Sequence, residues 1–323
     1  MSALRPKWRP LITKPWARAF ATDRGQQIFA LPDGRGLGFA EYGNPDGKPL
    51  LYFHGYPSSR LEAEALHNMA RLNDIRLLAL DRPGFGLSSP QINRQILDWP
   101  NDVREFSEGM NLPKFAVLGA SGGGPFALAC AHTLPSMLTG VVLFASGPPW
   151  AAGGHQMSLM RRIMSRMANN CPIVLKTLLQ VLVHSLKWLV TTGLVTRRLG
   201  KWLDEQDKKQ SASKPKTHSQ RIEALTKVVI DEPFRQGADA AVYEAKLLSS
   251  QDWGFRFEDV KFDQVHIWHG KEDGNAPITM IRYMAQRLPH CTLHELDNET
   301  HYTMFKYFEP AISSLFPKDR KVG

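Results

Sequence analysis

Residues Phe115–Ala131 read FAVLGASGGGPFALACA and place a single serine, Ser121, inside a run of glycines. An apolar segment typical of a β-strand precedes the glycines, and an apolar segment typical of a helix follows them. A strand, a glycine turn and a helix in this order can cradle a phosphate at the helix N-terminus or hold a serine as a nucleophile. The residues around Ser121 distinguish the two.

The phosphate-binding alternative requires residues that this stretch lacks. A phosphate loop needs Gly-x-x-x-x-Gly-Lys followed by Ser or Thr, and a dinucleotide site needs Gly-x-Gly-x-x-Gly with an acidic residue about 20 residues further on. No lysine follows Gly124, and the first acidic residue after Glu108 is Asp204. The sequence therefore argues against a phosphate or dinucleotide site here.

The segment Gly119-Ala-Ser-Gly-Gly123 instead fits Gly-x-Ser-x-Gly, the pattern of a nucleophile elbow. In this strand-to-helix turn the serine is strained and its hydroxyl stands above the sheet edge. The unpaired N–H groups of the helix start face any negative charge that develops. We expect glycine at 119 and 123 because a side chain at either position would collide with neighbouring backbone. Ser121 is therefore the candidate nucleophile.

A serine nucleophile needs a histidine base, and the histidine needs a carboxylate that fixes its tautomer. In nucleophile-elbow enzymes the chain order is Ser, acid, His. Asp273 follows the strand-like segment 264–269, and His301 lies on the polar loop after the strand-like segment 292–296. Of the eleven histidines, only His301 combines a late loop with an acid-bearing turn upstream.

Other carboxylates near these turns are weaker candidates for the acid. Strand alternation turns Glu272 away from the side that Asp273 faces. Asp297 and Glu299 are so close to His301 in sequence that we expect them to shape its loop. The strand-like segment 138–145 could carry the acid instead, but no acidic residue follows it until Asp204.

Acyl transfer also needs two donors for the oxyanion. One is expected to be the N–H of Gly122, directly after the nucleophile. The other is expected to be the N–H of Tyr56, which follows an apolar strand and His54-Gly55 and is restricted to extended conformations by Pro57. His54 is interpreted as a structural hydrogen-bonding residue, and Asp81 as the residue that orders the neighbouring turn.

Five motifs resemble those of the α/β-hydrolase superfamily: His54-Gly-Tyr-Pro57, Asp81-Arg-Pro-Gly-Phe-Gly86, Gly119-Ala-Ser-Gly-Gly123, His269-Gly-x-x-Asp273 and Glu299-Thr-His301. The resemblance covers about residues 26–147 and 251–315. It implies a Ser121, His301, Asp273 triad and an oxyanion hole from Tyr56 and Gly122. The aspartate nucleophile of dehalogenases and epoxide hydrolases is absent, as is the His-Gly-Gly-Pro-Gly of proline iminopeptidases. Ala276 and Thr300 stand where relatives often have valine and glycine.

The strand and helix pattern predicts an α/β fold: a mostly parallel, eight-stranded twisted sheet with helices on both faces and a helical cap insertion. The predicted strands lie near residues 26–31, 37–42, 50–54, 76–81, 115–119, 138–145, 264–269 and 292–296. We expect a basic tail at 1–24, core at 25–147, cap at 148–250 and core at 251–323.

Residues 173–189 of the expected cap predict a helix whose polar side is a single stripe formed by Lys176, Gln180, His184 and Lys187. The apolar remainder is wider than on an ordinary surface helix. It is interpreted first as cap interior packed on the core, with a lining for an apolar substrate or a membrane-facing surface as alternatives. Met157, Met160, Met164 and Met167 form a second stripe, typical of core or of adaptable ligand contacts. Residues 204–216 are interpreted as a loop.

Composition narrows the partners and the compartment. The formal charge of +9 lacks the interleaving of aromatic and basic residues typical of nucleic-acid modules, so no nucleic-acid partner is expected. The three cysteines offer neither a metal spacing nor an even disulfide set, which favours a reducing compartment and implies neither a metal nor a cofactor.

The first 22 residues are basic and lack an apolar stretch, so no secretory signal is expected. An intracellular, cytoplasmic protein is favoured. A mitochondrial presequence is the alternative, because Arg18-Ala-Phe-Ala21 resembles a matrix-protease site, although three prolines oppose the helix that such a presequence needs.

These features predict a serine hydrolase of the carboxylesterase type that cleaves an ester, lactone or thioester of an apolar small molecule through an acyl-enzyme. The alternatives are a carbon–carbon bond hydrolase or lyase with the same triad, and a small-molecule receptor that retains it. Residues 151–203 carry eight lysines and arginines and no carboxylate. This charge favours substrates with an anionic portion over cationic ones.

Overall fold

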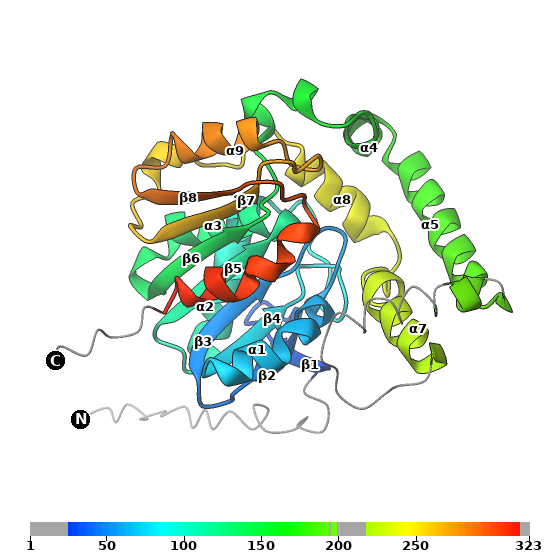
Figure 1. The fold of residues 1–323 in the computed structure, drawn as a ribbon, viewed down its shortest axis with the longest axis horizontal. Helices are drawn as coiled ribbons and strands as arrows, with labels where there is room; N and C mark the ends of the chain where they lie inside the picture. Colours follow the sequence, from blue (N-terminus) through cyan, green and yellow to red (C-terminus); the bar gives the residue numbers. More distant parts are fainter. Residues whose placement is uncertain (1–24, 194, 199, 201–217, 317–323) are drawn as a thin grey trace, which may run out of the picture.

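The computed structural model describes residues 25–193, 195–198, 200 and 218–316. The predicted basic tail, with its protease-like segment 18–21, and the predicted loop 204–216 lie outside the described residues. Eight strands form one sheet in the order β1-β2-β4-β3-β5-β6-β7-β8 (Figure 1). Their bounds are β1 Gln27–Ala30, β2 Gly36–Gly43, β3 Lys48–Phe53, β4 Ile75–Leu80, β5 Phe115–Ala120, β6 Leu138–Phe144, β7 Val265–Gly270 and β8 Cys291–Leu296.

The sheet is parallel from β4 to β8, and β1 and β2 pair antiparallel at one edge. Every predicted strand is present within two residues of its expected bounds. The inner strands β3 to β6 are continuous apolar runs with almost no exposed residue, because helices cover both faces of the sheet. The predicted mostly parallel α/β sheet is therefore confirmed.

Helices on the two faces enclose two separate apolar cores. One face holds α2 (Trp99–Gly109), α3 (Gly124–Thr133) and α9 (Ile278–Ala285), and the other holds α1 (His67–Leu72) and α10 (Phe308–Ser313). Short 3₁₀ turns connect the elements: η1 Arg60–Leu66, η2 Ile96–Asp98, η3 Ser121–Gly123, η4 Pro135–Met137, η5 Trp150–Ala152, η6 Gly154–Gln156, η8 Phe257–Asp259 and η9 Thr303–Tyr307.

A helical segment lies between β6 and β7, where the sequence predicts the cap. It contains α4 (Leu159–Asn170), α5 (Pro172–Leu189), α7 (His218–Thr226), the π-helical turn η7 (Lys227–Asp231) and α8 (Asp239–Leu248), and its described residues contain no strand. Figure 1 shows α8 next to the sheet and α5 as the outermost of these helices. The division of the chain at residues 148 and 250 stays a prediction.

Helix α5 forms as predicted, but its apolar residues are not cap interior. Only Leu175 and Val183 are buried. Eight others are 37% to 78% exposed: Ile173, Val174, Leu178, Val181, Leu182, Leu186, Trp188 and Leu189. The first interpretation of this helix, packing against the core, is therefore wrong for most of its surface. None of the described helices is long and apolar enough to cross a membrane.

Buried ion pairs fasten the cap segment to the core. The guanidinium of Arg60 lies 2.6 Å from the carboxylate of Glu232, beside η7. Glu244 on α8 accepts hydrogen bonds from Arg82 at 2.5 and 2.9 Å and from Arg94 at 2.8 Å. All five side chains are at most 4% exposed. Since each arginine belongs to the core and each glutamate to the cap segment, these pairs fix the end of η7 and helix α8 on the core.

Candidate active site

The backbone at Ser121 has the conformation expected of a nucleophile elbow. β5 ends at Ala120, and the next residue, Ser121, has a φ of +48° in the left-handed region that residues with side chains rarely adopt. A Cβ at position 119 would lie 2.5 Å from the carbonyl oxygen of Gly123, and a Cβ at position 123 would lie 2.2 Å from that of Phe53. The predicted need for glycine at both positions is confirmed.

The structure brings Ser121, His301 and Asp273 into one hydrogen-bonded chain. Nε2 of His301 is 3.1 Å from Oγ of Ser121, and its Nδ1 is 2.7 Å from Oδ2 of Asp273. The three residues lie on the turns and loops that follow β5, β7 and β8 of the same sheet. In a parallel sheet these loops gather at the carboxyl ends of the strands. When Nδ1 donates to the carboxylate, Nε2 is left to accept the serine proton.

Asp273 is held as a carboxylate by its surroundings. Its Oδ1 accepts the N–H groups of Asn275 at 2.8 Å and Ala276 at 2.9 Å. Burial alone raises the pKa of Asp273, but the hydrogen bond from His301 and nearby charge outweigh it and leave the pKa below its usual value. His269, whose Nε2 is 3.3 Å from the same carboxylate, donates to the carbonyl of Ala276 at 2.7 Å. Burial lowers the pKa of His269, which keeps its ring neutral.

The rival carboxylates point to lysines or to solvent. Glu272 is exposed. Asp297 pairs with Lys271 at 2.7 Å, and Glu299 pairs with Lys306 at 2.5 Å. These contacts order the turn before His301, as the sequence predicts.

Thr300, the residue that departs from the glycine of relatives, also stabilises this turn. Its hydroxyl accepts the N–H groups of Thr303 at 3.2 Å and of Tyr302 at 3.4 Å, and glycine has no side chain to accept either. The loop that carries His301 therefore gains two hydrogen bonds from the departure.

The two expected oxyanion donors lie against each other. A Cβ at Gly122 would be only 3.2 Å from the backbone nitrogen of Tyr56. The N–H of Tyr56 has no hydrogen-bond partner among the described residues, and that of Gly122 lies in the first turn of a helix, where N–H groups lack intrahelical partners. The preceding N–H, that of Gly55, donates to Glu62 at 3.1 Å, and the Tyr56–Pro57 peptide is cis. Two free donors beside the serine can stabilise a developing oxyanion.

His54 and Asp81 have the structural roles expected of them. Nε2 of His54 accepts the N–H of Arg82 at 3.2 Å. Asp81 accepts the N–H groups of Arg60 at 2.7 Å and Leu87 at 2.8 Å, which closes the turn after β4. Both side chains are fully buried and neither contacts Ser121, so they support the loop that carries Tyr56.

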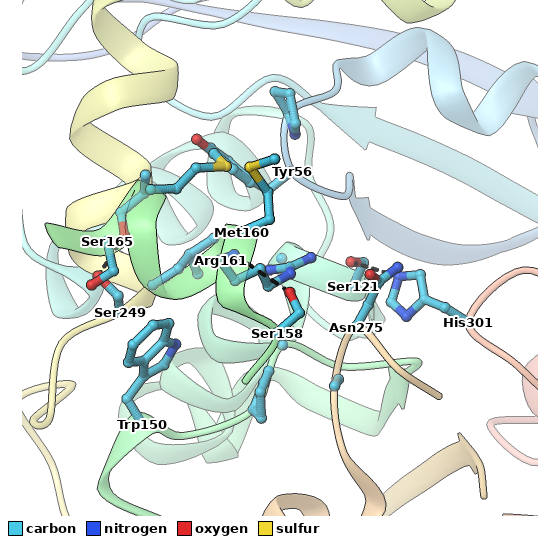
Figure 2. A pocket seen from close by; sticks show the side chains of 18 residues that line it. Tyr56, Ser121, Trp150, Ser158, Met160, Arg161, Ser165, Ser249, Asn275 and His301 are labelled. Carbon is cyan, nitrogen blue, oxygen red and sulfur yellow. Dashed lines mark hydrogen bonds between the residues drawn. The ribbon is translucent and has the colours of Figure 1, made fainter. Parts of the chain in front are cut away.

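A cavity of about 290 Å³ opens at Ser121 (Figure 2). This volume is near the lower limit for small-molecule sites. The core contributes Tyr56, Pro57, Ser121, Gly122, Gly147, Asn275, Ala276 and His301, and the cap segment contributes Pro148, Trp150, Ser158, Met160, Arg161, Met164, Ser165, Ala245, Leu248 and Ser249. The lining is mostly apolar, and Arg161 is its one permanently charged side chain.

The cap lining comes mainly from α4 and α8. Met160 and Met164 of the predicted methionine stripe face the cavity, whereas Met157 is buried. No described residue of α5 lines this cavity, so the interpretation of α5 as a substrate lining is wrong. The described residues contain no group of three or more histidine, cysteine or acidic side chains placed to hold a metal ion.

A family model described as the alpha/beta hydrolase fold matches residues 48–306. Curated relatives include the proline iminopeptidase of Xylella fastidiosa, 31% identical over 122 residues, which are 36% of this chain and 38% of that protein. The proline iminopeptidase of Arabidopsis thaliana is 30% identical over 110 residues, 33% of this chain and 29% of that protein. The chain thus spans well under half the length of these relatives.

Solved structures resemble the chain over most of its length. An esterase from Exiguobacterium antarcticum superposes with a TM-score of 0.61 at 15% identity, over 90% of this chain and 99% of that one. The enol-lactonase from Burkholderia xenovorans LB400 gives 0.61 at 14% identity, over 90% and 100%. At these identities the likeness shows a shared fold.

Proposed function

The chain belongs to the α/β-hydrolase fold family, and we propose that it is a serine hydrolase cleaving a carboxylic ester, lactone or thioester of a small, largely apolar molecule. One observation carries the proposal. The hydrogen-bonded chain from Asp273 through His301 ends at Ser121, where a cavity of small-molecule size opens beside two unpaired N–H groups. This arrangement supports the roles of Ser121 as nucleophile, His301 as base and the two N–H groups as oxyanion donors at one cavity.

The proposed reaction has two stages, acylation of the serine and hydrolysis of the acyl-enzyme. Oγ of Ser121 attacks the substrate carbonyl carbon while its proton passes to Nε2 of His301, and Asp273 stabilises the imidazolium. The carbonyl oxygen becomes negative beside the N–H groups of Tyr56 and Gly122. Collapse of this intermediate breaks the bond to the alcohol or thiol, which takes the proton from His301. Water then attacks the acyl-enzyme by the same proton transfers and releases the acid and the serine.

Peptide hydrolysis is the second candidate, because the curated relatives are named proline iminopeptidases. Two observations favour esters over such substrates. The loop reads His54-Gly-Tyr-Pro57 in place of the His-Gly-Gly-Pro-Gly of that group. In addition, no carboxylate lines the described cavity, and Arg161 does, so a substrate with a protonated amine meets repulsion.

A fluorophosphonate probe and short p-nitrophenyl esters test the proposal together. The wild type should be labelled and should turn over the esters. Ser121→Ala should abolish labelling and lower kcat by roughly 10⁵-fold or more, with an unchanged circular dichroism spectrum. Ser165→Ala, in the same cavity, is the matched control and should remain active.

Three outcomes would contradict the proposal. Full esterase activity in Ser121→Ala would exclude Ser121 as the nucleophile. Faster cleavage of prolyl p-nitroanilide than of matched esters would favour the peptidase. A labelled protein that turns over no ester would favour carbon–carbon bond cleavage or a receptor.

A further inference from the structure

Arg161, which is half-buried, differs from the fully buried arginines in how its charge is paired. The guanidiniums of Arg60, Arg82 and Arg94 each bond a buried carboxylate. The guanidinium of Arg161, on α4, has no hydrogen-bond or ion-pair partner among the described residues, and only its backbone N–H is engaged, by Ser158 at 3.4 Å. Figure 2 shows its side chain extending from α4 toward Ser121 and Asn275. Its five donors therefore remain available to the cavity.

Burying the charge of Arg161 without a partner costs free energy, and an anionic ligand could offset this cost. Burial lowers the pKa of Arg161 below its usual value, because removal from water disfavours the charge by more than the attraction of Tyr56 and Asp273 offsets. Arginine nevertheless stays charged at any physiological pH. A guanidinium matches the two oxygens of a carboxylate with parallel hydrogen bonds, and such bonds are the strong ones in a partly dry site.

We propose that Arg161 binds a carboxylate carried by the substrate, so that small esters or lactones bearing an anionic group near the scissile carbonyl are the preferred substrates. This inference rests on the proposed hydrolase function. The neighbouring Arg162 and Arg166 do not line the cavity, so the effect belongs to Arg161 alone.

The test compares esters that share a leaving group or an acyl group and carry different charges. p-Nitrophenyl butanoate, the p-nitrophenyl half-ester of succinate and p-nitrophenyl 4-(trimethylammonio)butanoate vary the acyl part; phenyl acetate and 3-acetoxybenzoate vary the alcohol part. In the wild type the cationic ester should be the poorest substrate, and salt should reduce its disadvantage. Arg161→Gln should lower kcat/KM for at least one anionic ester by about 10- to 100-fold and change the neutral esters less than about threefold.

Two variants refine the result. Arg161→Lys should restore part of the preference, because it keeps the charge but loses the paired geometry. Arg166→Gln, exposed on the same helix, should leave all rates unchanged. The inference is overturned if the neutral esters are hydrolysed yet Arg161→Gln changes anionic and neutral esters alike.

Binding separates this inference from the hydrolase proposal. Glutarate should bind Ser121→Ala in calorimetry and should bind the double variant Ser121→Ala, Arg161→Gln at least about tenfold more weakly. If no ester is turned over, this comparison still decides whether Arg161 holds a carboxylate, and equal binding by both variants would overturn the inference.

The exposed faces of α4 and α5 carry a second, independent inference. Leu159, Met160 and Ile163 on α4 are 41% to 68% exposed. A helix turns 100° per residue, which places the most exposed apolar residues of α5, apart from Ile173, in one arc of its surface. Lys176 and Lys187 lie on the opposite side of the helix, where they pair with Asp239 and Asp231. Contiguous apolar surface of this kind marks a contact site.

Charge identifies the partner. The described part of residues 151–200 contains no carboxylate, and Arg162 and Arg166 lie beside the apolar stripe of α4. A partner must therefore be apolar and negatively charged at once. We infer that α4 and α5 dock on the surface of an anionic lipid bilayer, with their apolar side chains at the level of the headgroups. Because Met160 is both exposed and part of the cavity lining, this contact would place the cavity mouth at the membrane surface.

Vesicle flotation of the full chain tests the second inference. The protein should float with vesicles of phosphatidylcholine and phosphatidylglycerol in equal parts and bind pure phosphatidylcholine at least about tenfold more weakly. The double variant Leu178→Ser, Leu182→Ser should lose most of this binding. Leu72→Ser, which removes a 75% exposed residue on α1, should not. Undiminished binding by the double variant, no binding by the wild type, or a dimer that the double variant dissociates would overturn the inference.

Discussion

Replacing Glu244 by glutamine should destabilise the protein markedly. Glu244 is fully buried on α8 and accepts hydrogen bonds from two arginines that are themselves buried. Glutamine keeps the shape but leaves two guanidiniums without a countercharge, and breaking a buried pair in this way costs about 3–5 kcal/mol. A chain of 323 residues unfolds with an entropy of about 0.7 kcal/mol/K, which converts this cost into a fall in Tm of roughly 4–7 °C.

Differential scanning calorimetry on both proteins under the same buffer and scan rate measures the shift. Glu223→Gln, which removes the same charge from an exposed position on α7, is the matched control and should change Tm by less than about 1 °C. A Tm for Glu244→Gln within about 1 °C of the wild type would refute the conclusion that these ion pairs fasten the cap segment to the core.

Three further outcomes are expected. Asp273→Asn should lower kcat about 10⁴-fold by imposing the wrong histidine tautomer, whereas Asp297→Asn should stay within a few-fold; steady-state kinetics on a neutral ester measures both. Gly123→Ala should lower the Tm by several degrees or abolish soluble expression, since its Cβ would lie 2.2 Å from a carbonyl oxygen; thermal melts decide. Burial raises the pKa of Glu244 but its arginines lower it by more, so the pKa in the folded protein lies below the ordinary value of 4.5. The stability contributed by ionised Glu244 is present above pH 4.5 and is lost as the pH falls through the pKa of the folded protein. The difference in unfolding free energy between the wild type and Glu244→Gln, measured by denaturant titration, should therefore shrink from about pH 6 to pH 3.

The strands and the elbow could be predicted because their signals are local. Continuous apolar runs bounded by glycine and proline mark buried parallel strands. The glycines around Ser121 and the positions of Asp273 and His301 after late strands follow from the chain order of elbow enzymes. Parallel strands place such turns at one sheet edge, so the sequence also brings these three residues together.

The surroundings of the site could not be predicted because they depend on pairing over long distances. Arg82 and Glu244 are 162 positions apart in the sequence, and the residues next to either one do not indicate that the two will pair. Arg161 is one of eight basic residues in a stretch that contains no acidic residue. Only the orientation of α4 in the folded protein places the side chain of Arg161 at the cavity. The apolar residues of α5 cover the same part of the helix surface whether the helix is buried or exposed, so the sequence periodicity cannot distinguish the two.

Arg82 joins the cap segment to the oxyanion loop through one side chain. Its guanidinium donates to the carbonyls of His54 at 2.5 Å and of the next residue at 2.9 Å, and it also binds Glu244 on α8. A second link joins the same elements, since the hydroxyl of Tyr56 donates to the carbonyl of Ala241 at 2.7 Å. The N–H donors and the α8 wall of the cavity are thus one rigid unit, and movement of α8 would displace the catalytic geometry. Helix α4 has no comparable buried ion pair among its described residues. Substitutions on α4, the helix that carries Arg161, should therefore be able to change the substrate preference and leave the catalytic steps intact.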